Sequence, residues 1–160
     1  MDVNFINPVL ASVRSVFTTM GQLSHVEFDN PHIRNPDEIS CGVVTGLMSM
    51  TCEKSRASIS LSFSESAILG IANNFLTEER SAIDCMVTDL VGEFTNMVMG
   101  DAKRQLEEKG FKFNLSLPVV IKGIDHLIAH RANAHIIRVP GSTQHGSFCV
   151  EAVYETLHKT

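Results

Sequence analysis

Hydrophobic and polar positions along the chain alternate between helical and strand spacing. Apolar residues recur every three or four positions after Pro8 and stop at Gly21, which predicts a helix with proline near its start and glycine at its end. The stretch 24–36 is rich in Pro, Asn and Asp, which predicts a loop with a short extended piece. The segments 42–50 and 57–63 are then predicted to be two paired strands, and the second alternates apolar residues with serines, which indicates a half-buried face.

A pair of helices is predicted next. Helical spacing returns over 65–76, and a longer helix is predicted from a cap at Ser81 to about Lys109, before Gly110 ends it. Five apolar residues of the longer helix repeat at spacings of four, three, four and four. They predict its core-facing stripe, which consists of Ile83, Val87, Leu90, Phe94 and Val98.

The last part of the chain returns to strand spacing. Alternation over 111–117, with the phenylalanines and leucines inward, predicts a strand that changes course at Pro118. Two more strands are predicted at 134–139 and 147–153, with Pro140-Gly141 starting the turn between them.

These elements predict an α+β fold, in which a mixed or antiparallel sheet packs against long helices. Their order indicates a weak internal duplication of α-β-β-α units, in which Gly21 to Pro31 would correspond to Gly100 to Pro118. At 160 residues the chain is long enough for one full core, so we expect a single domain over 1–160.

Charge and hydropathy limit the classes of partner. The formal net charge is −5 and Lys and Arg are scattered, which disfavours a nucleic-acid or anionic-membrane surface. No apolar run approaches the roughly 18 residues that cross a bilayer, and Met1-Asp2-Val3-Asn4 lacks the order of a signal peptide. We therefore expect a cytoplasmic protein with no nucleic-acid and no membrane partner.

Cysteine and histidine spacings do not match a metal site. The cysteines are far apart and form no Cys-x-x-Cys pair, so they are expected to be reduced and mostly buried. Cys85 falls off the apolar stripe, but no histidine lies nearby in sequence to activate its thiol. His126, His130 and His135 are closer together, but no helical signal places two of them on one face, so surface or strand histidines are expected.

The pattern that carries chemistry is Asp89-x-x-x-Glu93-x-x-Asn96, with Pro118 standing 22 positions after the asparagine. A helix advances roughly 100° per residue, so the three polar side chains share one face, over a quarter turn away from the apolar stripe. A carboxylate and a carboxamide on an exposed helix face can hold a cation and orient a water molecule. Taken alone, the same residues also fit a solvated polar face.

Glu-x-x-Asn alone carries little information, because a chain of this composition should contain about 0.6 such pairs by chance. A second pair, Glu27 and Asn30, serves as an internal control. Leu23 stands where the acid would be needed, and Cys52 stands where the proline would be needed. The copy at Glu93 has both flanking residues.

Two glycines bracket Asn96 on the long helix, Gly92 at i−4 and Gly100 at i+4. Each costs about 1 kcal/mol relative to alanine inside a helix. One explanation is close packing against a neighbouring helix. The other is that bare backbone beside Asn96 lets a bulky partner, or a phosphoryl group on it, come near.

The pattern of Asp89, Glu93, Asn96 and Pro118 resembles the signature of the CheC/CheX/FliY family of chemotaxis phosphatases. Three features are most similar to the CheX branch: the single motif copy, the N-terminal segment Phe5-Ile6-Asn7-Pro8 and the strand end Ser116-Leu117-Pro118. A FliY-type motor component would carry two copies and extra domains.

This resemblance implies a CheC-like fold and a homodimeric phosphatase that acts on the aspartyl phosphate of a CheY-type response regulator. It implies that Asn96 orients the attacking water and that Glu93 docks against the lysine at the regulator's active site. Asp89, Gly92, Gly100 and Pro118 are expected to support these two. Mg²⁺ is expected on the regulator, with no cofactor or metal bound by this chain. The alternative is a non-catalytic adaptor that binds response regulators or flagellar-motor components.

Overall fold

The computed structural model describes residues 3–157. The ends of the expected domain 1–160, which are Met1, Asp2 and residues 158–160, lie outside it. Its elements in chain order are α1 (Val3–Thr19), β1 (Val26–Phe28), β2 (His32–Ile33), β3 (Val44–Thr51), β4 (Ser55–Phe63), α2 (Glu65–Phe75), α3 (Cys85–Glu108), β5 (Asn114–Leu115), β6 (Val119–Lys122), β7 (Ile137–Thr143) and β8 (Ser147–Thr156).

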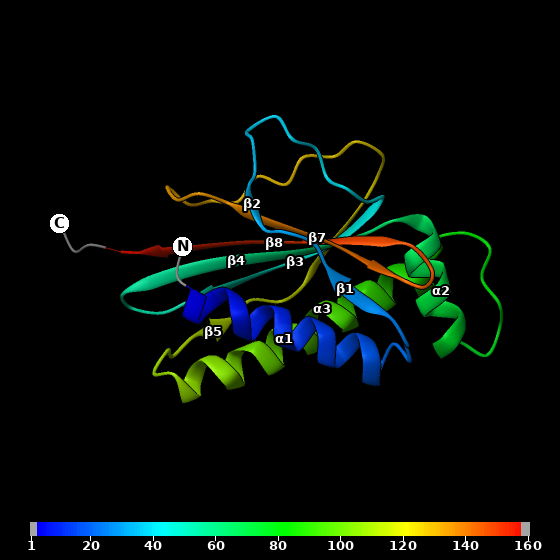
Figure 1. The fold of residues 1–160 in the computed structure, drawn as a ribbon, viewed down its shortest axis with the longest axis horizontal. Coiled ribbons are helices and arrows are strands. Elements are labelled where there is room, and N and C mark those ends of the chain that lie inside the picture. The colour runs from blue at the N-terminus through cyan, green and yellow to red at the C-terminus, as the bar shows by residue number, and fades with distance from the viewer. Residues whose placement is uncertain (1–2, 158–160) are drawn as a thin grey trace.

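The strands form one 8-stranded sheet in the order β1-β7-β8-β4-β3-β5, with β2 also paired to β7 and β6 also paired to β3. Every one of these pairings is antiparallel. Helices α1 and α3 run under one face of the sheet, while the long loops 34–43 and 123–136 cover the other (Figure 1). The predicted α+β fold, with a sheet packed against long helices, is therefore confirmed.

The two halves of the chain have matching topology. Helix α1 precedes β1 to β4, and helix α3 precedes β5 to β8. Strands β4 and β8 pair at the centre of the sheet, with β3 and β7 outside them. Two short strands then cap each side, and they come from the opposite half: β5 and β6 on β3, and β1 and β2 on β7. This arrangement supports the internal duplication.

Both outer strand pairs are interrupted at a proline. The pairing register shifts by one between β5 and β6, so Leu117 and Pro118 together stand opposite Met48 of β3. The register shifts in the same way between β1 and β2, so Pro31 and the residue before it stand opposite Val139 of β7. Each interruption is a bulge on the edge of the sheet, where proline is tolerated because no donor is needed.

The structure corrects several predicted boundaries around these prolines. The strand expected over 111–117 shrinks to β5 and resumes after Pro118 as β6, and Leu117 is 86% exposed instead of inward-facing. Pro140-Gly141 starts no turn, because β7 continues to Thr143. The Pro140 carbonyl accepts the Asp29 N–H at 2.8 Å, so the ring nitrogen faces the break between β1 and β2, where the sheet lacks a partner.

The helix boundaries also differ from prediction. Helix α1 begins at Val3, so Pro8 lies inside it. The cap of α3 is Asp84 and not Ser81, because the Asp84 carboxylate accepts the Val87 N–H at 3.0 Å, directly before the first helical residue. Within the duplication, the glycine after α1 matches Gly110 after α3, whereas Gly100 lies inside α3.

Among residues 3–157, no helix has the length and apolarity that a membrane span requires.

Candidate functional site

The core side of α3 fixes the direction of the motif residues. The predicted apolar stripe is buried, as expected. The Phe94 ring, directly after Glu93 in sequence, packs edge-on against Phe17 at 6.2 Å and against Phe75 at 5.8 Å between ring centroids. These contacts with α1 and α2 prevent the helix from rotating, so the opposite face of α3 stays in solvent.

A glycine in the sheet sets the distance between α3 and β3. A methyl group placed on Gly46 would overlap the Oγ1 of Thr95 and lie 2.9 Å from its Cβ. The Thr95 side chain is fully buried, and its hydroxyl donates to the Val91 carbonyl at 2.7 Å. The helix therefore lies as close to β3 as its own side chains allow, which carries its outer face to the edge formed by β6.

Asp89, Glu93 and Asn96 all lie exposed on that outer face, as the helical spacing predicts. Among the described residues, none of the three side chains makes a hydrogen bond or an ion pair. Two carboxylates and one carboxamide therefore present unused acceptors and donors to any molecule that docks here.

A shallow depression of about 530 Å³ runs between α3 and the edge of the sheet. It brings together four of the expected site residues, Asp89, Gly92, Glu93 and Pro118. Asn96 lies one turn further along α3, outside the lining of the depression, and Gly100 lies one turn beyond that. The complete lining is Thr88, Asp89, Gly92, Glu93, Pro118, Val120 and Lys122.

The two glycines of α3 have different surroundings. A Cβ on Gly92 would lie 3.5 Å from the Cγ2 of Val120 in β6, an ordinary contact with a strand. A Cβ on Gly100 would meet nothing within 4 Å. Close packing against a neighbouring helix therefore explains neither glycine. Bare helix backbone beside Asn96 is left open to a partner.

Lys122 is a site residue that was missing from the sequence-based prediction. Its Nζ donates to the carbonyl of Ile83 at 2.5 Å, just before α3 begins. Pro118, Val120 and Lys122 alternate along the edge and face α3 together. The same alternation would have identified Lys122 if the strand had been placed after Pro118 instead of before it.

Cysteines and metal-ligating groups do not gather at this depression. All four cysteines are free, but Cys41 and Cys85 are exposed and Cys52 is half-buried, so the expectation of mostly buried thiols is wrong. Cys149 is buried. Within residues 3–157, no group of three or more His, Cys, Asp or Glu side chains is placed to hold a metal ion.

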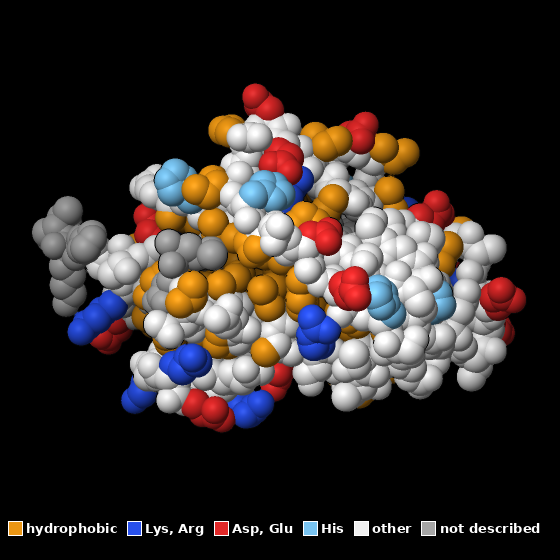
Figure 2. All heavy atoms as spheres, viewed as in Figure 1, with side chains coloured by type: hydrophobic (Ala, Val, Ile, Leu, Met, Phe, Trp, Pro, Cys, Tyr) orange, Lys and Arg blue, Asp and Glu red, His pale blue; other side chains and the backbone are white. Residues whose placement is uncertain are grey.

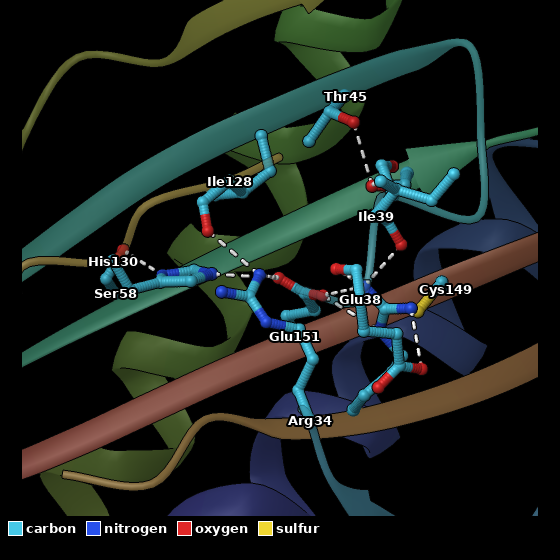
Figure 3. A network of polar contacts seen from close by, with 12 residues as sticks. Arg34, Glu38, Ile39, Thr45, Ser58, Ile128, His130, Cys149 and Glu151 are labelled. Carbon is cyan, nitrogen blue, oxygen red and sulfur yellow. Dashed lines mark hydrogen bonds and ion pairs between the residues drawn. The ribbon is translucent and has the colours of Figure 1, made fainter. Parts of the chain in front are cut away.

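A second cluster of charge lies on the other face of the sheet and is buried (Figure 3). The carboxylate of Glu151 in β8 accepts from Arg34 at 2.8 Å, from Arg138 at 2.6 Å and from His130 at 3.1 Å. His130 also contacts the Ser58 hydroxyl at 2.8 Å, and its side chain is fully buried. The expectation of a surface or strand histidine is therefore wrong for His130, which lies in a covering loop.

This buried cluster attaches the covering loops to the sheet. Arg34 also donates to the Ile128 carbonyl at 2.8 Å, and Arg138 also donates to the Ile39 carbonyl at 2.8 Å. Both loops are thus held by the same carboxylate of Glu151. The cluster lacks open access, so it stabilises the fold and leaves the α3 face as the candidate site.

The antiparallel sheet with helices on one face is the fold of CheC-like proteins. The chain is similar to a CheC-like superfamily protein from Shewanella sp. PV-4, with a TM-score of 0.90, 39% identity, and coverage of 97% of this chain and 99% of that one. It is also similar to the chemotaxis protein CheX from Vibrio vulnificus, with a TM-score of 0.88, 42% identity, and coverage of 94% and 99%. No match is found among curated proteins.

Residues 44–142, more than half of the chain, match the family model described as chemotaxis phosphatase CheX. The chain therefore belongs to the CheX family of chemotaxis phosphatases. A structure of the CheX–CheY–BeF₃–Mg²⁺ complex from Borrelia burgdorferi matches with a TM-score of 0.79 and 22% identity, covering 96% of this chain and 99% of that one. At this identity the likeness shows the fold alone.

Proposed function

We propose that this protein removes the phosphoryl group from the aspartyl phosphate of a CheY-type response regulator in chemotaxis signalling. The observation that carries the proposal is the exposed, unpartnered pair Glu93 and Asn96 on one face of α3, in a chain of the CheX family. The Borrelia burgdorferi complex, which contains CheX, CheY, BeF₃ and Mg²⁺, supports a CheY-type partner.

In this proposal Asn96 positions the attacking water. An acyl phosphate held by Mg²⁺ already has a good leaving group, so the phosphatase has to place a water in line with the phosphorus and need not supply a nucleophile. The carboxamide can accept a hydrogen bond from that water and donate one toward a phosphoryl oxygen. The open backbone at Gly100 leaves room for the regulator beside Asn96.

Glu93 is the docking residue in the same proposal. Its free carboxylate pairs with the lysine of the regulator's active site, and partial desolvation makes this pair stronger than an exposed salt bridge. Asp89, Gly92 and Pro118 support it by shaping the depression, with Pro118 fixing the bulge beside Glu93.

Two alanine variants test the two roles separately. Asn96→Ala is expected to reduce stimulated phosphate release by about 100-fold or more, while the dissociation constant for the regulator changes little. Glu93→Ala is expected to weaken binding of the regulator more strongly than Asn96→Ala does. Asn30→Ala is the matched control, because Asn30 belongs to the other exposed Glu-x-x-Asn pair and should leave both quantities unchanged.

Phosphate release at the wild-type rate from the Asn96→Ala protein would rule out this mechanism. If the wild-type protein binds the phosphorylated regulator without accelerating phosphate release, the adaptor function replaces the phosphatase function.

We further propose that the protein acts in the cytoplasm as a homodimer. The dimer is supported by the unpaired outer edge of β2, where Ile33 is 55% exposed beside an apolar recess of about 250 Å³. Figure 2 shows hydrophobic side chains gathered over the region of α1, β7 and β8 that surrounds this recess. Analytical ultracentrifugation tests the dimer, and Ile33→Lys should shift it to the monomer.

A further inference from the structure

The depression beside Glu93 contains a positive charge as well as negative ones. Lys122 lines it together with Asp89 and Glu93. Its Nζ is held by the Ile83 carbonyl, and among the described residues no carboxylate lies within ion-pair distance of it. A carbonyl uses one of the three N–H donors and does not neutralise the charge, so Lys122 is a fixed cation that can still bind an anion.

The position of Lys122 along α3 determines which anion it can reach. The contact with Ile83 places it at the start of the helix, on the Asp89 side of Glu93. A helix rises 1.5 Å per residue, so Cys85, the first residue of α3, and Asn96 are separated by about 16 Å along the axis, and Ile83 lies before Cys85. A phosphoryl group beside Asn96 is therefore too far away for Lys122 to bind at the same time.

We propose that Lys122 is a specificity-determining docking residue, which binds a carboxylate on the regulator's surface, about 16 Å or more from its phosphorylated aspartate. This inference rests on the proposed function, because it takes the regulator as the partner. The carboxylates of Glu93 and Asp89 and the ammonium of Lys122 then form a bipolar surface, with Lys122 as its only cation among the lining residues. A partner must present a base opposite Glu93 and an acid opposite Lys122, which fixes the orientation of docking and rejects regulators with other charge patterns.

A purely structural role for Lys122 makes different predictions. If the bond to Ile83 served only to anchor the start of α3, then removing it would lower thermal stability and misplace Asn96, which lowers kcat. A docking contact instead changes Kd and KM and leaves kcat intact. The docking contact also depends on ionic strength, because one member of the pair is a lysine at a solvent-accessible rim.

The experiment compares Lys122→Gln, Lys122→Arg and wild type on the CheY-type regulator of the same organism. Binding is measured with the regulator unphosphorylated and phosphorylated by acetyl phosphate, at about 0.05 M and about 0.5 M salt, and steady-state phosphate release is measured in parallel. Lys112→Gln is the matched control. Lys112 is exposed beyond the other end of α3, roughly 35 Å along the helix from Ile83.

Lys122→Gln is expected to raise Kd and KM about 5-fold at low salt and less than about 2-fold at high salt, with kcat unchanged. The loss should be equal for both forms of the regulator, since the carboxylate is present in both. Lys122→Arg keeps the charge and should remain within about 2-fold of wild type, as should Lys112→Gln.

Three results overturn the inference. They are a Lys122→Gln protein with wild-type Kd, a loss that affects only the phosphorylated regulator, and a loss of kcat together with a lower melting temperature. The first of these, in a protein that still releases phosphate, refutes the role of Lys122 and leaves the proposed function standing. If the wild-type protein binds the regulator but does not release phosphate, the phosphatase function is refuted. A salt-dependent loss of binding in Lys122→Gln would still support the docking contact in that case. A wild-type protein that does not bind the regulator refutes both.

Discussion

Gly46 of β3 lies directly beneath Thr95 of α3, so closely that the hydrogen in place of a side chain is what allows the helix to lie there. Thr95 stands between Glu93 and Asn96 in sequence, and its side chain points to the opposite side of the helix. The distance between Gly46 and Thr95 therefore sets how far the motif face, the exposed side of α3 with Asp89, Glu93 and Asn96, lies from the sheet edge at β6. A residue remote from the partner's surface controls the geometry of the site.

Gly46→Ala is expected to lower the free energy of unfolding by about 1–3 kcal/mol, because the new methyl group forces buried Thr95 and the helix away from β3. Phosphate release should fall as well, since Asn96 moves with α3. Chemical denaturation and the phosphatase assay measure the two effects. Gly123→Ala is the control, because a Cβ there would meet nothing within 4 Å. Equal stability of the two variants would show that the helix can shift without cost.

Gly100→Ala should have opposite effects on stability and on function. Alanine at an open position inside a helix is expected to raise the free energy of unfolding by about 1 kcal/mol. The same methyl group should weaken binding of the regulator, if bare backbone beside Asn96 is the surface that the regulator approaches. Thermal denaturation and binding titration separate the two effects. A variant that is more stable and binds as well as wild type would leave the glycine without a functional role.

The motif face was predictable from the sequence because helical periodicity requires only local spacing. The buried stripe through Phe94 and the exposure of Glu93 and Asn96 both follow from residue positions on one helix. Lys122 was missed because its place at the site depends on a register shift at Pro118, and register is a property of two strands.

The buried cluster around Glu151 was missed for a similar reason. Its partners, Arg34, His130 and Arg138, come from two loops and a neighbouring strand, so no local pattern connects them. One local signal was present. Glu151 stands in the apolar run Cys149-Val-Glu-Ala-Val, and a charge at an inward position of a buried strand requires partners from elsewhere in the chain.

Glu151 also predicts how stability depends on pH. Burial by itself would raise the pKa of Glu151, but hydrogen bonds from His130 and Arg138 and the charge of Arg34 outweigh it and hold the pKa below its ordinary value of 4.5. A carboxyl whose pKa is lower in the folded state stabilises the protein above the unfolded-state pKa. This stabilisation is lost as the pH falls through the folded-state pKa. The free energy of unfolding should therefore decrease below about pH 4.

Glu151→Gln isolates this contribution. At pH 7 the variant should lose about 3–5 kcal/mol of stability, because Arg34 remains buried without an anion and Arg138 keeps only the part-exposed Glu38. Below about pH 4 the difference from wild type should shrink, because wild-type Glu151 becomes protonated and its charge is lost there too. Glu155→Gln is the control: its carboxylate pairs with the part-exposed Arg56 at 2.6 Å, so solvent replaces that contact and the change at pH 7 should be much smaller. Denaturant titrations of the three proteins at several pH values measure these differences in the free energy of unfolding. If the difference between Glu151→Gln and wild type stays constant across the acid range, the charge of Glu151 does not hold the loops to the sheet.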